Sequence, residues 1–204
     1  MPSVVYKGFM TENLITADSA KALIFDCDGT LVDSMPLHMR AWRHTFERFS
    51  AAYDEEFLYA LRGMKETEII LAYNRRSGSG LDPDALVREK HRYFMRHISE
   101  VRPIESVARL AREKSGVLPL AVVSGSRKRI VHRELAVTGL KDLFAVILTA
   151  DDPFTPKPAP DIFLEAARRM KVDPGDCHVF EDGDPGMAAA HAAGMAATDI
   201  RMYI

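Results

Sequence analysis

Residues 22–30 are Ala22-Leu23-Ile24-Phe25-Asp26-Cys27-Asp28-Gly29-Thr30. The first four are apolar and predict a short buried strand, which leads directly into two aspartates separated by one residue. Because side chains two apart share one side of a strand, we expect Asp26 and Asp28 to converge on one small volume at its carboxyl end. Two carboxylates so close repel each other, so the pair requires a cation or a shared proton. The plainer alternative is a strand that ends in an ordinary Asp-Gly turn.

Short apolar runs and helical patterns alternate along most of the remaining chain. The runs at 118–123, 145–149, 177–180 and 196–200 predict strands, and the segments between them predict helices. Together with the first strand they give about five strands alternating with helices, which is typical of a parallel sheet covered on both faces. The expected fold class is therefore α/β, a Rossmann-like doubly wound parallel sheet with its ligand site at the carboxyl ends of the strands.

Residues 37–102 interrupt this alternation because they contain helical patterns and no strand signal. After a helix that opens near Ser34 and Pro36, further helical patterns cover 54–62, 65–76 and 82–100. Their apolar residues predict a small bundle with its own core, formed by Phe57, Leu61, Ile69, Tyr73, Leu86, Tyr93 and Ile98. We interpret 37–102 as a helical cap inserted after the first strand, 21–36 and 103–204 as the catalytic core, and 1–20 as an N-terminal arm of unknown role.

The composition restricts the class of protein. The chain has 204 residues, of which 47% are hydrophobic and 27% charged, which fits a globular protein with a buried core. A formal net charge of −2 gives no reason to expect a nucleic acid or an acidic membrane as a partner. Cys27 and Cys177 both lie in apolar runs, so we expect two buried core residues and no disulfide. Without an apolar segment long enough to span a membrane or a recognisable signal peptide, we expect a cytoplasmic monomer or weak dimer.

Polar residues also follow the later strands. Ser124 and Gly125 stand between the second strand and a helix, where a hydroxyl and free helix amides form an anion cradle, although a serine N-cap is the simpler alternative. Lys157 lies in a proline-rich segment, which indicates either a cation held in one direction or a solvated polyproline loop. Glu181 and Asp182 follow the fourth strand and would complete, with the first pair, a set of oxygen ligands suited to Mg²⁺.

Four of these segments occur in the order found in one large enzyme superfamily. They are Asp26-Cys27-Asp28-Gly29-Thr30, Ser124-Gly125, Lys157-Pro158-Ala159-Pro160 and Glu181-Asp182-Gly183-Asp184. Over about residues 21–200 the chain resembles the haloacid dehalogenase superfamily of phosphohydrolases and phosphomutases. The helical insert resembles that of the β-phosphoglucomutase-like subgroup, in which the chain is most similar to fructose-1-phosphate-type phosphosugar phosphatases. Dehalogenating members lack the second aspartate, so Asp28 argues against dehalogenase activity.

The resemblance implies a role for each motif. Asp26 would be the nucleophile that becomes an aspartyl-phosphate, and Asp28 the general acid and base. Ser124 and the Gly125 amide would bind the phosphoryl oxygens, and Lys157 would neutralise their charge. The implied Mg²⁺ ligands are Asp26, the backbone carbonyl of Asp28, Asp182, and Glu181 directly or through water, with Asp184 as a further candidate. In the cap, the candidates for substrate contact are His38, Arg62 and Lys65.

Three functions remain open at this point. The leading hypothesis is a Mg²⁺-dependent phosphatase that hydrolyses a small phosphorylated sugar. A phosphomutase with the same core is the second, and a non-catalytic phosphosugar-binding protein is the third. The intact set of charged motif residues argues against the third hypothesis, because buried like charges without a use destabilise a fold. Glu66 argues against the second, because the phosphoglucomutases resembled here have an arginine three residues after the glycine that matches Gly63, where it grips a second phosphate.

Overall fold

The central sheet confirms the predicted α/β class. In the computed structural model, which describes residues 20–61 and 64–204, five parallel strands stand in the order β5-β4-β1-β6-β7. They are β1 (Ala22–Phe25), β4 (Leu120–Val123), β5 (Val146–Leu148), β6 (Cys177–Glu181) and β7 (Ala196–Asp199). The second strand begins two residues later than predicted, after Pro119, which has no amide hydrogen to give to a ladder. The shorter elements are 3₁₀ turns at Ile98–Glu100, Lys141–Leu143, Pro174–Asp176 and Ile200–Met202.

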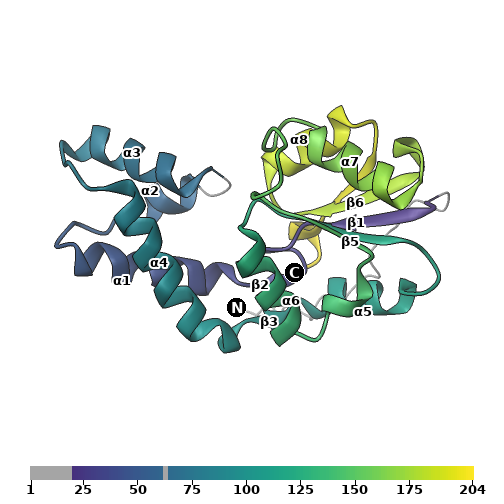
Figure 1. The fold of residues 1–204 in the computed structure, drawn as a ribbon, viewed down its shortest axis with the longest axis horizontal. Coiled ribbons are helices and arrows are strands. Elements are labelled where there is room, and N and C mark those ends of the chain that lie inside the picture. The colour runs from purple at the N-terminus through teal and green to yellow at the C-terminus, as the bar shows by residue number, and fades with distance from the viewer. Residues whose placement is uncertain (1–19, 62–63) are drawn as a thin grey trace, which may run out of the picture.

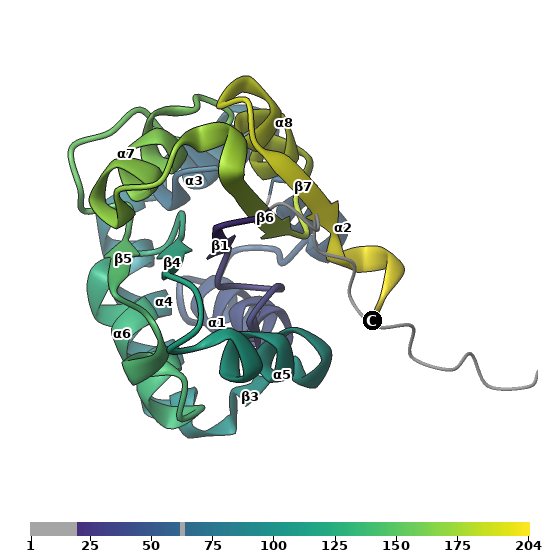
Figure 2. The same ribbon diagram turned by 90° about the vertical axis from the view of Figure 1, so that its right-hand side faces the viewer.

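Helices cover both faces of the sheet. In Figure 2, α7 (Asp161–Met170) and α8 (Asp184–Ala192) lie on one face, and α5 (Glu105–Lys114) and α6 (Lys128–Val137) on the other. Side chains of β1 alternate between the two layers: Leu23 and Phe25 pack with the residues of α5 and α6, while Ala22 and Ile24 pack with those of α7 and α8. All four side chains of β1 are fully buried, which is why the strand is a continuous apolar run.

The insert between β1 and β4 is helical, as predicted. It contains α1 (Met35–Arg48), α2 (Glu55–Ala60), α3 (Glu66–Ser77) and α4 (Pro83–His97), which Figure 1 shows beside the sheet. Ile69, Tyr73 and Leu86 are buried in a cluster of its own, as predicted. Tyr93 and Ile98 pack instead with the core cluster around β1, because the end of α4 and the 3₁₀ turn that follows it lie against that cluster. The division into a core and a 37–102 cap stays a prediction, and the predicted arm, except for Ala20, lies outside the described residues.

The two connections of the insert run side by side as a short antiparallel ribbon. Val32 of β2 (Val32–Asp33) pairs with Pro103 of β3 (Arg102–Pro103), and the Ile104 amide donates to the Leu31 carbonyl at 2.9 Å. Ser34 follows the ribbon at the N-cap position of α1, but its hydroxyl does not cap the helix. It donates to Asp28 instead, at 2.6 Å, although a serine shortly before Pro36 is typical of an N-cap.

Both cysteines are buried and free, as predicted. Burial raises the pKa of Cys177 to about 11, and it also raises that of Cys27 well above its ordinary value. Neither thiol therefore has the character of a reactive thiolate. Within residues 20–61 and 64–204, no helix combines the length and the apolar character needed to cross a membrane.

We predict that the helical insert moves as one unit about the β2–β3 ribbon when a phosphate analogue binds. Closure would expel water from the charged strand ends, where electrostatic stabilisation is strongest in a dry site. Scattering profiles and crystal structures with and without the analogue measure the angle between α4 and the sheet. Identical angles in the two states would contradict a moving cap.

Candidate functional site

The register of β1 against β6 places two acidic residues next to each other. Phe25 is opposite Phe180 in this ladder, and the Asp26 amide donates to the Phe180 carbonyl at 3.0 Å. Asp26 therefore follows β1 beside Glu181, the last residue of β6. Because β4 and β6 flank β1 on opposite sides, this point is the topological switch of the sheet, the usual place for a ligand in open α/β folds.

Lys157 joins these two carboxylates. Its Nζ lies 2.8 Å from Asp26 Oδ1 and 2.7 Å from Glu181 Oε2, and it also donates to the Val123 carbonyl at 3.1 Å. Burial alone would lower the pKa of Lys157, but the two carboxylates outweigh this effect and raise it. The proline-rich segment thus holds a cation over the strand ends, as predicted, and is not a solvated loop around Lys157.

Asp182 adds a third carboxylate to the same place. One carboxylate oxygen each from Asp26, Glu181 and Asp182 lie within 4.8 Å of one another, and Thr30 Oγ1 donates to Asp182 Oδ1 at 3.1 Å. Burial and the charge of Glu181 raise the pKa of Asp26 well above its ordinary value, and the same two causes raise the pKa of Asp182 to about 6. Three carboxylates around one ammonium leave an excess of negative charge, so this donor set fits a hard divalent cation.

Asp184, the further candidate, lies outside this acidic group. Its side chain is 85% exposed and pairs with Arg201 at 2.7 Å. It is the first residue of α8, and its carboxylate is not part of the group that Asp26, Glu181 and Asp182 form.

Two glycines allow the acidic group to form. Gly29 has a φ of +84°, and a β-carbon there would lie 2.5 Å from Asp182 Oδ2. A β-carbon on Gly186 of α8 would lie 2.1 Å from the Glu181 carboxyl group. Any larger residue at either position would displace a carboxylate, so both glycines are required by close approach.

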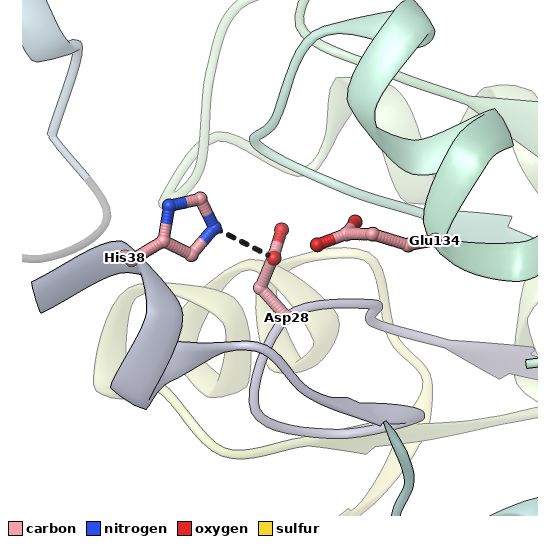
Figure 3. A group of neighbouring side chains, drawn as sticks. All are labelled: Asp28, His38 and Glu134. Atoms are coloured by element: carbon pink, nitrogen blue, oxygen red, sulfur yellow. Dashed lines mark hydrogen bonds and ion pairs between the residues drawn. The ribbon is translucent and has the colours of Figure 1, made fainter. Parts of the chain in front are cut away.

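The carboxylates of Asp26 and Asp28 do not converge, contrary to the expectation from strand alternation. The strand ends at Phe25 and the chain turns, so the two-residue period no longer applies. Asp28 belongs to a separate cluster with His38 and Glu134, which Figure 3 shows from three different elements. The predicted convergence of Asp26 and Asp28 on one small volume is therefore wrong, although each aspartate lies in a charged cluster.

Four donors surround the Asp28 carboxylate. Ser34 and Ser126 donate at 2.6 Å each, His38 Nε2 lies at 3.0 Å, and Ser124 Oγ at 3.5 Å. Burial alone would raise the pKa of Asp28, but the hydrogen bonds from His38, Ser126 and Ser34 lower it far below the ordinary range. Asp28 is thus held as a carboxylate in this geometry.

His38 links Asp28 to the insert. Lys90 Nζ lies 2.9 Å from His38 Nδ1, and because an ammonium can only donate, we assign the imidazole proton to Nε2, which donates to Asp28. Burial and Lys90 lower the pKa of His38, which agrees with a neutral ring. Lys90 also contacts Glu66, whose other oxygen contacts His91. Glu66, Lys90, His38 and Asp28 therefore form a continuous polar chain from insert to core.

Glu134 of α6 approaches Asp28 from the other side. Its carboxyl group is fully buried, its Oε2 accepts a weak bond from the Cys27 thiol at 3.7 Å, and its Oε1 has no hydrogen-bond partner among the described residues. Burial and the charge of Asp28 raise the pKa of Glu134 well above its ordinary value. Two buried carboxylates this close do not both ionise, so Glu134 is the protonated member of the pair.

The remaining predicted residues have differing surroundings. Ser124 is buried directly after β4, and its hydroxyl accepts from the Ser126 amide at 3.0 Å. It is not the N-cap of α6, because the Lys128 amide in the first turn of that helix donates to Asp151 at 2.9 Å. Gly125 is exposed, with open space where a β-carbon would stand. Lys65 is exposed at the start of α3. Arg62, with Gly63, lies outside the described residues.

Sequence reasoning missed Lys90, Glu134 and Ser126. Lys90 lies on the buried stripe of α4 between Leu86 and Phe94, and Glu134 follows Ile130 on the buried stripe of α6. A charged residue at such a position was the available signal, because burying it requires a partner.

Comparisons with known proteins agree with the motif order. The family model described as Haloacid dehalogenase-like hydrolase matches residues 23–200. The fructose-1-phosphate phosphatase YqaB of Escherichia coli is 40% identical over 88% of this chain and 96% of its own length. The β-phosphoglucomutase of Bacillus subtilis is 31% identical over 88% of this chain and 83% of its own. The crystal structure of CbbY from Rhodobacter sphaeroides with phosphate superimposes with a TM-score of 0.78 at 27% identity, covering 87% of this chain and 84% of that one.

We predict that Asp182→Asn changes how stability without metal depends on pH. The folded pKa of Asp182, about 6, is above its ordinary value of 3.8, so the wild-type carboxyl group contributes stability below pH 4 that is lost as the pH rises through 6. Between pH 4 and pH 7 in chelator, the free energy of unfolding of the wild type should fall by on the order of 2 kcal/mol relative to that of the variant. Denaturant unfolding of both proteins measures the difference. A stability difference independent of pH would contradict the assignment.

Proposed function

The chain belongs to the haloacid dehalogenase-like hydrolases, and we propose that it is a phosphatase that hydrolyses a small phosphosugar through an aspartyl-phosphate. The observation that carries the proposal is the contact of Lys157 with both Asp26 and Glu181, beside Asp182. This arrangement orients a buried carboxylate and supplies charge to neutralise the phosphate that it must approach.

Asp26 is the nucleophile in this proposal. Lys157 binds its Oδ1 and fixes the carboxylate plane, and we assign the attack on phosphorus to Oδ2. The new Asp26–phosphorus bond forms as the ester bond to the sugar oxygen breaks, and water later cleaves the aspartyl-phosphate to release phosphate and restore Asp26. Ser124 and the Gly125 amide are assigned to the phosphoryl oxygens. Mg²⁺ held by Asp26, Glu181, Asp182 and the Asp28 carbonyl would reduce the repulsion between the carboxylate and the phosphoryl group.

Asp28 is the general acid and base. It gives a proton to the departing sugar oxygen and then takes one from the attacking water. In the described geometry its carboxylate is occupied by the hydroxyls of Ser34 and Ser126 and by His38. It must therefore lose part of this set and gain a proton before it can act. Ser34 and His38 lie at and beyond the β2–β3 ribbon, so movement of the insert would change the hydrogen bonds of the acid directly.

The substrate assignment rests on the relatives, which are named for fructose 1-phosphate and β-phosphoglucose chemistry. His38 meets Asp28 and not open solvent, so it would contact substrate only if the cluster rearranges. Lys65 and Arg62 stay predicted sugar or phosphate contacts. A cytoplasmic monomer or weak dimer likewise stays a prediction.

Glu66 favours a phosphatase over a phosphomutase. A mutase must bind a bisphosphate through two transfers, and arginine suits the second phosphate because its planar fork donates two hydrogen bonds. At the corresponding position this chain has a carboxylate, which already contacts Lys90 and His91. Burial alone would raise the pKa of Glu66, but Lys90 and His91 lower it well below the ordinary range, so the group is an anion. It would repel a second phosphate.

We predict that Asp26→Asn lowers kcat for p-nitrophenyl phosphate by about 10⁴-fold or more, because it removes the nucleophile. The same change removes a carboxylate from a crowded acidic group, so the melting temperature in chelator should hold or rise. Phosphate release with and without Mg²⁺, together with thermal unfolding, tests both statements. Substantial Mg²⁺-dependent turnover by the variant would sink the nucleophile assignment.

We also predict that free sugar and phosphate are the main products. The assay follows phosphate and isomeric monophosphate from β-glucose 1-phosphate and fructose 1-phosphate, with a trace of the matching bisphosphate as primer. Should isomerisation exceed phosphate release by more than about tenfold, roughly 1.4 kcal/mol in relative barrier, the protein is a mutase. Glu66→Arg is the matched variant, and it should shift the ratio toward isomerisation.

A further inference from the structure

A cleft lies between α4 of the insert and α6 of the core. Its volume is about 800 Å³. In both views α6 lies beside the C-terminal part of α4 (Figures 1 and 2). None of the residues that we assign to catalysis or to metal binding lines it; the lining residues are Arg88, His91, Arg92, Met95, Arg96, Arg127, Arg129, Ile130, Arg133 and Asp151.

Helical spacing arranges the arginines in two rows. Arg88, Arg92 and Arg96 follow one another at steps of four on α4 and therefore share one face of that helix. Arg129 and Arg133 do the same on α6. The row on α4 extends over about 12 Å at 1.5 Å per residue, which is longer than a single phosphate group.

Most of these arginines have no carboxylate to neutralise them. Within the described part of the chain, Arg92 pairs with Glu89, whereas Arg88, Arg96, Arg129 and Arg133 form no ion pair. Asp151, the one carboxylate of the lining, accepts the Lys128 amide. Several arginines elsewhere in the chain are paired with carboxylates: Arg40, Arg43, Arg76, Arg112, Arg168, Arg169 and Arg201. Positive charge therefore accumulates in this cleft of a protein whose formal net charge is −2.

We propose that the cleft between α4 and α6 is a binding site, separate from the catalytic site, for a compact oligophosphate such as tripolyphosphate or the triphosphate of a nucleotide. Arginine forks bind phosphate through paired hydrogen bonds, and two rows match a chain of phosphates better than a single one. The cleft has the size of a small-molecule site. A nucleic-acid surface would require basic charge over a wider area and aromatic residues for stacking, and the lining contains no Phe, Tyr or Trp.

Such a ligand would link the two parts of the molecule. One wall of the cleft belongs to α4, which also carries Lys90, and the other to α6, which also carries Glu134. An anion bound by both rows would hold these helices at one separation. The proposal itself concerns binding and does not depend on the phosphatase assignment.

Isothermal titration calorimetry with tripolyphosphate, without divalent metal, tests the site in the full-length protein. We expect one tripolyphosphate per chain, with affinity lowered about tenfold or more by Arg88→Gln/Arg96→Gln and by Arg129→Gln/Arg133→Gln. The matched control is Arg109→Gln/Arg112→Gln, which removes the same charge from exposed positions on α5 and should change the affinity less than about twofold. All three double variants should retain their far-UV spectrum and their turnover of p-nitrophenyl phosphate.

Four outcomes would overturn the proposal. The first is that both cleft variants bind tripolyphosphate as tightly as the wild type, and the second is that the α5 control loses as much affinity as they do. The third is that orthophosphate displaces tripolyphosphate in strict competition at the catalytic site. The fourth is tighter binding of a single-stranded oligoribonucleotide than of tripolyphosphate, which would assign the surface to nucleic acid.

Discussion

The structure depends on how it keeps three carboxylates together at the end of two neighbouring strands. The ladder between β1 and β6 fixes Asp26 beside Glu181, because the Asp26 amide donates to the Phe180 carbonyl directly after the Phe25–Phe180 pair. Lys157 balances part of this charge from the loop after β5, and Thr30 donates to Asp182. Carboxylates repel one another strongly in a buried site, so their positions must be held closely. Gly29 and Gly186 leave the space that the Asp182 and Glu181 carboxylates occupy, and a β-carbon at either position would displace one of them.

The second constraint is the hydrogen-bonded set around Asp28. Its donors come from the end of the ribbon, from α1 and from the loop after β4, so residues of both the insert and the sheet region hold the carboxylate that we propose as the general acid. A rotation about the β2–β3 ribbon cannot leave these bonds unchanged, because Ser34 follows the ribbon directly. The proposed rotation and the proposed proton transfer would therefore be coupled by geometry, without any long-range pathway.

Local sequence signals predicted the sheet, the helical insert and the motif residues, because each depends on a short apolar run or on a residue that follows one. The same signals failed where the chain turns. Alternation along a strand placed Asp26 and Asp28 together, yet the strand ends at Phe25 and their carboxylates lie in separate clusters. Lys90 and Glu134 lie far from Asp28 in sequence, and only tertiary packing brings them to it. Ser34 has the sequence context of an N-cap, but the carboxylate of Asp28 is a stronger acceptor for its hydroxyl.

The separation of the two aspartates shifts their pKa values in opposite directions. Burial among carboxylates raises the pKa of Asp26, whereas hydrogen-bond donors lower that of Asp28. A nucleophile must be ionised and an acid must be protonated, so both pKa shifts oppose the roles that we propose for the two groups. A cation at the acidic group would favour ionised Asp26, and loss of the Ser34 and His38 hydrogen bonds would favour protonated Asp28. Under the proposed mechanism, metal binding and movement of the insert would therefore have to coincide before phosphoryl transfer. The need for both events would also disfavour phosphoryl transfer while the strand ends that carry Asp26 are still open to water.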